Sequence, residues 1–323
     1  MAEANRSTSG MIVDVHAHHA PPGLGRRSDP SQVLKQPPQE PFEARIARMA
    51  EAGVGLQVLS STTPTYQADA AEAVEKARIV NDELSARCLQ DPGRFRFWAS
   101  LPLPHVDEAL AEMQRVLNHP GAVGIMLGCS CQGGSIAREA FDPIYAEMER
   151  RRGVIFLHPV QNGLASPLIN DLGLTVCAGA SMEDSVAALH LIARRVPQRF
   201  PSIRFIVPHF GGILPMLLNR LDGQMPRAPG TEAPSAVARK FFYDTVGWGS
   251  KAALFAALEA FGDTQIVAGS DYPILLSWES YDQTFRHISQ SGLPAGAIEN
   301  ILFNNAKSLL NLDAAEQSLR PPS

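Results

Sequence analysis

Eight short apolar segments rich in β-branched residues recur along the chain. They are Met11–Val15, Gly55–Ser60, Phe95–Leu103, Ala122–Gly128, Val154–Pro159, Arg204–His209, Phe241–Val246 and Gln265–Asp271. Continuous apolar runs of this length, without polar alternation, are typical of parallel strands that are buried on both faces. The pattern therefore predicts a parallel sheet covered by other elements.

Amphipathic segments typical of helices separate these strands. They are Pro41–Ala52, Ala68–Leu89, Val106–Asn118, Asp142–Arg151, Met182–Arg195, Ile213–Leu221 and Lys251–Phe261. Eight strands that alternate with helices indicate an α/β fold and favour a closed (β/α)₈ TIM barrel over an open doubly wound sheet. Leu293–Leu312 predicts a C-terminal helix beyond the eighth strand.

A length of 323 residues could hold two domains, but barrels of this kind commonly run to ~250 residues or more as one domain. The segments 20–39 and 224–235 are irregular, and each directly follows a predicted strand or helix. We interpret them as loops of the active face rather than interdomain linkers. We therefore expect a single domain over residues 11–312, with a disordered N-terminal tail (1–10) and a polar C-terminal tail (313–323).

Composition narrows the classes of function. Hydrophobic residues make up 45% and charged residues 19%, a balance that can bury a large core, and the net charge of −5 argues against a nucleic-acid partner. The first residues carry no apolar signal segment, and no uncharged apolar run reaches membrane-spanning length, so we expect no membrane partner. The four cysteines fit neither a zinc ribbon nor a disulfide framework, which predicts reduced thiols in a cytoplasmic protein.

Residues suited to metal binding follow four of the predicted strands. The first strand runs into His16 and His18, the fifth ends in His158, the sixth in His209 and the eighth in Asp271. In a (β/α)₈ barrel these ends meet at one rim, where the active site forms. His16 and His18 are two positions apart and thus share one face of their strand.

Three imidazoles and one carboxylate form a ligand set that suits Zn²⁺ first and Mn²⁺ or Fe²⁺ less well. We therefore predict that His16, His18, His158 and Asp271 bind one divalent ion. His209 would then stand beside it as an acid, a base or an electrostatic stabiliser. Each residue alone has an ordinary explanation, such as a buried, hydrogen-bonded histidine or an aspartate that caps a turn. Their coincidence at four strand ends favours the metal site.

These residues, in this order, resemble the amidohydrolase superfamily, and in particular its branch of amino-carboxymuconate-semialdehyde and salicylate-type decarboxylases. The segments that carry the resemblance are IVDVHAH, ARIARMAEAGVGLQVLS, FDPIYAEMERRRGVIFLHP, VPQRFPSIRFIVPHFGG, KFFYDTVGW and IVAGSDYP. The resemblance implies a mononuclear metal site with His209 in the outer catalytic shell. Binuclear members carry a carboxylated lysine after strand four, where this chain reads AVGIMLGCS, which favours one metal ion.

The resemblance also suggests substrate contacts. In the muconate-semialdehyde enzyme an arginine at the place of Arg220 reaches into the neighbouring subunit and binds the substrate carboxylate, which predicts a homodimer here. The alternative is that Arg220 pairs with Asp222 or a neighbouring helix. Trp248, in the loop after strand seven, is a candidate for contact with the substrate ring or for ordinary packing at the rim. That enzyme's tryptophan after the strand-five histidine is absent from HPVQNGLASPLINDLGL, which argues against its particular substrate.

Three functions remain open from the sequence. The first is metal-dependent, non-oxidative decarboxylation of a small hydroxy-aromatic or related unsaturated carboxylic acid, with Asp271 as proton carrier and His209 assisting. The second is hydrolysis of a lactone, amide or other C–N or C–O bond by metal-activated water. The third is metal binding without catalysis. The missing lysine favours the first.

Overall fold

The structure is a computed structural model that describes residues 11–21, 24, 41–62 and 65–312. The two predicted tails, 1–10 and 313–323, and most of the loop 20–39 lie outside the described residues.

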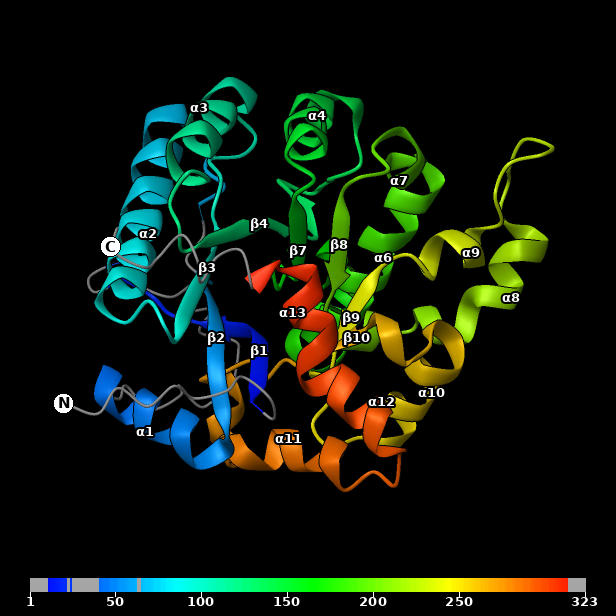
Figure 1. Ribbon diagram of the computed structural model, residues 1–323. Helices are drawn as coiled ribbons and strands as arrows, with labels where there is room; N and C mark the ends of the chain where they lie inside the picture. The colour runs from blue at the N-terminus through cyan, green and yellow to red at the C-terminus, as the bar shows by residue number, and fades with distance from the viewer. Residues whose placement is uncertain (1–10, 22–23, 25–40, 63–64, 313–323) are drawn as a thin grey trace.

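The eight predicted strands form one parallel sheet that curls into a barrel (Figure 1). In spatial order they are β1 (Ile12–His18), β2 (Val54–Ser60), β3 (Phe95–Ala99), β4 (Ala122–Gly128), β7 (Val154–His158), β8 (Arg204–Val207), β9 (Phe242–Asp244) and β10 (Ile266–Val267). The chain beyond β10 closes the barrel against β1, because Val15 N–H donates to the Ala268 carbonyl (2.9 Å) and Asp271 N–H to the His16 carbonyl (2.8 Å). The predicted (β/α)₈ fold is confirmed.

Helices cover the outside of this barrel. They are α1 (Phe42–Ala52), α2 (Ala70–Gln90), α3 (Val106–Val116), α4 (Asp142–Arg151), α5 (Pro167–Asn170), α6 (Ala180–Ala193), α7 (Val196–Arg199), α8 (Leu214–Gln224), α9 (Pro234–Ala238), α10 (Lys251–Phe261), α11 (Tyr281–Ser289), α12 (Ala295–Glu299) and α13 (Asn305–Leu309). Capping residues determine where several of these helices begin or end. The Asp69 side chain accepts from Glu72 N–H to begin α2, and Gly53, with φ of 73°, ends α1 in the left-handed conformation.

Four features differ from the sequence prediction. A small hairpin, β5 (Ser130–Cys131) with β6 (Gly134–Ser135), follows β4, and α11 lies between the eighth strand and the terminal helix. The predicted terminal helix is divided into α12, a π-helical turn and α13. Strands six and eight are shorter than predicted, and the left-handed backbones of His209 (φ 53°) and Asp271 (φ 59°) cannot belong to a strand.

Two apolar layers hold the barrel together. The larger layer packs the outer strand faces against the surrounding helices. The smaller layer fills the barrel interior, where Trp98 and Phe156 lie fully buried and Trp98 Nε1 donates to the Val15 carbonyl (2.9 Å). Phe303 and Leu309, from the C-terminal segment, belong to this interior layer, and Figure 1 shows α13 lying across the barrel strands. The terminal segment therefore closes one end of the barrel.

One helical stretch of the described residues, Thr175–Ala193, is long and apolar enough to cross a membrane. It has 19 residues and a mean hydropathy of 1.2, and half of it is buried inside the protein. A packed helix of a barrel gives the same signal, and this one carries two buried acidic side chains, Glu183 and Asp184. The expectation of no membrane partner stays a prediction.

We predict that Phe303→Ala lowers the free energy of unfolding by about 3–5 kcal/mol, because it leaves a cavity where the terminal segment closes the barrel. Phe303 is 7% exposed, whereas Phe255 on α10 is 45% exposed and gives the matched control, Phe255→Ala, which should cost much less. Urea denaturation of the two variants measures the difference. Equal losses would contradict the closing role of this segment.

Candidate active site

Four side chains converge at the carboxyl end of the strands. His16 and His18 come from β1, His158 from the end of β7, and Asp271 from the turn after β10. Their ligand atoms all lie within 4.8 Å of one another. The Nε2 atom of His18 lies 3.1 Å from Nε2 of both His16 and His158 and 2.9 Å from Asp271 Oδ1. The structure thus brings together all four of the predicted metal ligands.

These distances fit a single divalent ion. Two ligands that bind one tetrahedral zinc ion at about 2.0 Å lie about 3.3 Å apart, close to the separations between the imidazole nitrogens here. His16, His18 and His158 are buried, and Asp271 is partly exposed. The atoms available to bind a metal are three nitrogens and one oxygen. When all three rings carry their proton on Nδ1, the facing Nε2 lone pairs repel one another unless a cation lies between them. The donor set therefore fits the metal that the sequence predicts.

Hydrogen bonds at the far nitrogen of each ring aim Nε2 inward. Nδ1 of His16 donates to Asp244 Oδ2 (2.6 Å), and Nδ1 of His158 donates to the Pro159 carbonyl (2.9 Å). His18 Nδ1 lies 2.9 Å from Ser60 Oγ, which itself donates to the Ala17 carbonyl and so accepts from the ring. With the proton on Nδ1, each Nε2 presents its lone pair to the centre, which is the arrangement that metal binding requires.

The charges of these groups suit a cation. Burial, together with neighbouring His18, His16 and His209, holds the pKa of His158 well below its usual value, so this ring is neutral at physiological pH. For Asp271, burial raises the pKa, but its close contact with His18 and the nearby His16 and His209 rings outweigh burial and lower the pKa overall. Asp271 is therefore a carboxylate at neutral pH. Neutral imidazoles and an ionised carboxylate are the forms that bind metal.

His209 stands beside the cluster but outside it. Its ring centroid lies 5.7 Å from that of His16, and its Nδ1 donates to Asp184 Oδ2 (2.7 Å). Burial lowers the pKa of His209, but the carboxylates of Asp184, Asp244 and Asp271 raise it to about 9. His209 thus carries a proton near neutral pH, as an acid in the outer shell requires.

A buried polar network lies beneath the two β1 histidines. Asp14 Oδ2 accepts from Gln57 Nε2 (2.9 Å), from the Tyr281 hydroxyl (2.8 Å) and from Ser270 Oγ (2.7 Å). Ser270 directly precedes the ligand Asp271, and Gln57 belongs to β2. The network therefore ties β1, β2, α11 and the turn after β10 together, which fixes the ligands that they carry.

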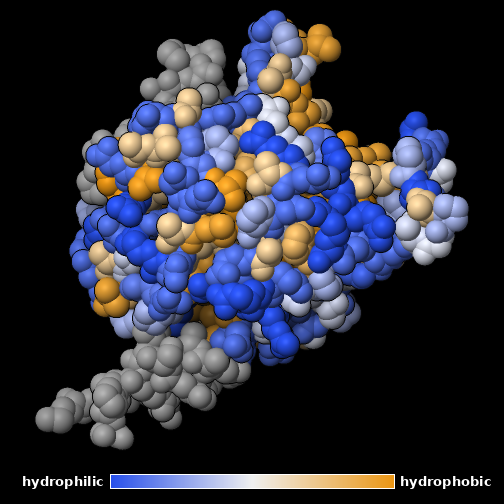
Figure 2. Space-filling model, turned by 90° about the horizontal axis from the view of Figure 1, so that it is seen from above, coloured by the Kyte–Doolittle hydropathy of each residue, from blue (hydrophilic) through white to orange (hydrophobic). Residues whose placement is uncertain are grey.

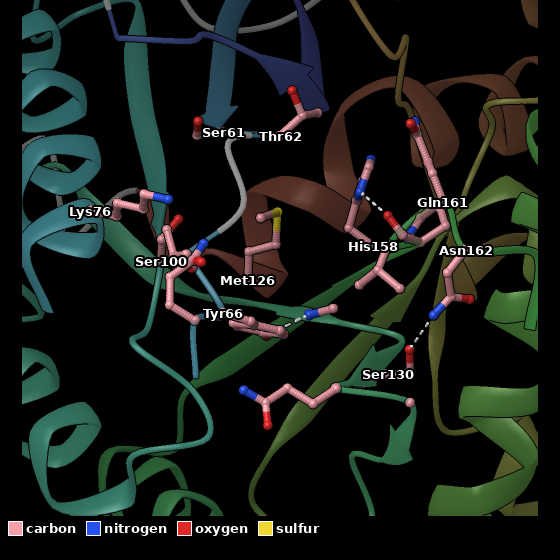
Figure 3. A pocket seen from close by; sticks show the side chains of 17 residues that line it. Ser61, Thr62, Tyr66, Lys76, Ser100, Met126, Ser130, His158, Gln161 and Asn162 are labelled. Atoms are coloured by element: carbon pink, nitrogen blue, oxygen red, sulfur yellow. Dashed lines mark hydrogen bonds between the residues drawn. The ribbon is translucent and has the colours of Figure 1, made fainter. Parts of the chain in front are cut away.

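A cavity of about 600 Å³ opens beside His158 (Figure 3). Its walls come from the loop after β2, the ends of β4 and β7, the hairpin and α2. Hydroxyl and amide groups dominate among the lining residues, which are Ser61, Thr62, Thr65, Tyr66, Gln67, Lys76, Ser100, Met126, Gly128, Ser130, Gln132, Gly133, His158, Pro159, Val160, Gln161 and Asn162. This volume is that of a small-molecule site.

The structure places the two predicted substrate contacts away from this cavity. Arg220 is exposed on α8 and donates to Gln224 Oε1 (3.1 Å) of the same helix, not to Asp222. Trp248 is 47% exposed and packs edge-to-face on Trp278, with ring centroids 4.4 Å apart. Neither residue lines the cavity beside His158. Their roles in substrate binding stay predictions.

Sequence reasoning missed two carboxylates that position the histidines. Asp244 is the last residue of β9 and accepts a hydrogen bond from His16. A comparison of the residues that end each strand would have identified it. Asp184 lies on α6 and binds His209. Its signal is the adjacent acidic pair Glu183-Asp184 inside an apolar helix, because a buried charge needs a partner.

Residues 13–312 match the sequence family described as amidohydrolase. The chain belongs to this family. Among its relatives, the chain is 28% identical to the 6-methylsalicylic acid decarboxylase of Penicillium expansum, over 81% of this chain and 84% of that protein. It is also 28% identical to the gamma-resorcylate decarboxylase of Rhizobium sp. (strain MTP-10005), over 84% of this chain and 88% of that protein.

Solved structures of the same architecture include a dihydroxybenzoic acid decarboxylase from Polaromonas sp. JS666 with bound manganese and the inhibitor 2-nitroresorcinol. That structure superposes with a TM-score of 0.84 at 23% identity, and the match covers 96% of this chain and 99% of that one. The likeness confirms the barrel fold of this amidohydrolase.

For the metal site of this amidohydrolase we predict that His158→Ala and Asp271→Ala each remove most of the bound metal, because each deletes one of only four protein ligands. Elemental analysis of the purified variants after metal loading measures the occupancy. His190→Ala, at an exposed position of α6, is the control and should keep the wild-type metal content. Full occupancy in the Asp271→Ala protein would contradict the site.

Proposed function

We propose that this amidohydrolase is a metal-dependent, non-oxidative decarboxylase of a small hydroxy-aromatic carboxylic acid. The observation that carries the proposal is one four-ligand centre, bordered by His209, with a cavity of small-molecule size beside its ligand His158. β4 ends in Gly128, with no lysine at the place of a second metal's bridging ligand. The decarboxylase names of the relatives support the same reaction.

His16, His18, His158 and Asp271 would hold the ion. When bound, a divalent ion supplies Lewis-acid stabilisation of negative charge and alignment of the substrate carboxylate. An N₃O set favours Zn²⁺, with Mn²⁺ as the alternative, and manganese occurs in the Polaromonas structure.

Residues of the chain supply the proton that decarboxylation requires. Decarboxylation breaks the bond between the ring carbon and the carboxylate carbon, leaves the electron pair on the ring carbon and releases CO₂. A proton must then reach that carbon. Because Asp271 is ionised at neutral pH, it would first take a proton from the protonated His209, which is held by Asp184, and would then pass this proton to the ring carbon. The buried position of Asp184 keeps the His209 ring in one orientation.

The proposed active unit is a homodimer in a reducing compartment such as the cytoplasm. Four free cysteines support the compartment. For the dimer, large apolar side chains are exposed on the segment after β7 and on α8, the helix that carries Arg220: Leu168 is 85% exposed, Leu172 76% and Met216 82%. Figure 2 shows hydrophobic side chains interrupting the polar surface. We propose that these exposed side chains contact a second copy of the chain.

Product analysis tests the reaction. The metal-loaded protein, incubated with 2,6-dihydroxybenzoate and related hydroxybenzoates in ¹⁸O-labelled water, should release CO₂ and yield a phenol that carries no label. His209→Ala should keep its metal but lose turnover by ~10² or more, the range typical of acid–base groups. A protein that releases no CO₂ from these acids, but adds labelled oxygen from the water to a lactone or an amide, would instead be the hydrolase alternative. Near-normal turnover in His209→Ala would remove this residue from the mechanism.

Subunit mixing tests Arg220. If its guanidinium reaches a neighbour's site, an Arg220→Ala protein and a His209→Ala protein, each inactive alone, should regain activity when mixed, because some hybrid dimers hold one intact site. Activity is measured after subunit exchange has been verified by mass spectrometry of tagged chains. No recovery in exchanged dimers would leave Arg220 as a structural residue of α8.

A further inference from the structure

The loop after β7 carries an amide that lacks a partner beside a metal ligand. Gln161 follows His158 by three residues and lines the same cavity. Figure 3 shows the two side chains pointing in the same direction. Among the described residues, no hydrogen bond to the Gln161 side chain is formed; only its backbone N–H is bonded. An amide in such a wall has a donor and an acceptor to offer to a ligand.

The backbone is held so that Gln161 keeps this direction. Its φ is 57°, a left-handed conformation that is unfavourable for a residue with a Cβ atom. The buried Glu183 carboxylate accepts four backbone N–H groups of this loop, from Val160 (2.7 Å), Gln161 (3.2 Å), Asn162 (2.8 Å) and Gly163 (2.8 Å). Charge-assisted bonds of this kind can hold a strained conformation in place. Glu183 is therefore a positioning residue for the loop.

The charge of the cavity restricts what Gln161 can contact. Among the described residues that line it, Lys76 is the one lysine, and there is no arginine. Lys76 Nζ already pairs with Glu72 Oε1 at 2.7 Å on the same helix. Beyond the metal centre, the described walls within one subunit therefore offer hydroxyl and amide groups but no unpaired cation. Burying a second carboxylate there would leave its charge uncompensated, which is unfavourable.

From the amide and the uncharged wall together, we propose that Gln161 is a substrate-contacting specificity residue. It hydrogen-bonds a second, neutral hydroxyl group on the ring and so selects monocarboxylic dihydroxy-aromatic acids over acids with a second carboxylate. The inference rests on the proposed function, because it places the first carboxylate of the substrate at the metal centre.

Binding measurements test this selection independently of turnover. Calorimetry on the metal-loaded protein compares 2,6-dihydroxybenzoate, 2-hydroxybenzoate and 4-hydroxyisophthalate. The dihydroxy acid should bind tightest and the diacid weakest. Gln161→Met, which keeps the size but removes the amide, should weaken the dihydroxy acid by ~10-fold and leave the monohydroxy acid nearly unchanged. Gln161→Arg should strengthen binding of the diacid, because it supplies the missing cation.

The control is Gln290→Met, an exposed glutamine at the end of α11, which should change none of the three affinities. A diacid that binds the wild type as tightly as the dihydroxy acid would overturn the inference. So would a Gln161→Met protein that keeps the wild-type preference for the dihydroxy acid. If the preference holds but no acid releases CO₂, the proposed function fails and the Gln161 contact stands.

The positioning role of Glu183 is tested by a double-mutant cycle on the same affinities. If Glu183 acts through Gln161, then Gln161→Met should cost the dihydroxy acid little more once Glu183→Gln has released the loop. Additive losses would assign Glu183 to general loop stability and remove its positioning role. Circular dichroism melting of each variant confirms that the measured proteins are folded.

Discussion

Three imidazole nitrogens that face one another at close range are the constraint on which the rest of the site depends. His18 Nε2 lies 3.1 Å from the Nε2 atoms of His16 and His158, so with the protons on Nδ1 the lone pairs of three rings face one another. A hydrogen bond at each Nδ1 keeps these rings from turning away, through Asp244 for His16 and a backbone carbonyl for His158. The protein thus maintains an arrangement that becomes favourable only with a cation at its centre.

The barrel supplies the rigidity that this arrangement needs. β1 carries two of the ligands and is held on both sides, by β2 through the sheet and by the chain after β10 through backbone bonds. Asp14 adds a buried polar anchor beneath them; burial raises its pKa, and the hydrogen bonds that it accepts oppose this shift. The left-handed backbones of His209 and Asp271 sit on this frame, which offsets their conformational cost.

Two consecutive acidic residues of α6 hold two different parts of the site in place. Glu183 binds the loop that follows His158, and Asp184 binds the His209 ring. Adjacent positions on a helix point about 100° apart, so one helical turn can serve two neighbouring strands. The apolar helical stretch Thr175–Ala193 therefore contains two buried acidic residues because each of them holds a part of the active site.

The sequence by itself determined the barrel and the metal ligands, because buried parallel strands show as apolar runs and their ends meet at one rim wherever the barrel closes. Tertiary structure alone decided the partners of those ligands. Asp244 lies 228 positions from His16 and Asp184 lies 25 positions from His209, separations that no local pattern encodes. Tertiary structure also decided the direction of the Gln161 side chain. This direction depends on the left-handed backbone of Gln161, whose N–H donates to the Glu183 carboxylate of α6. Periodicity reports which residues face the core, whereas hydrogen bonds between distant elements depend on how the strands and helices are brought together.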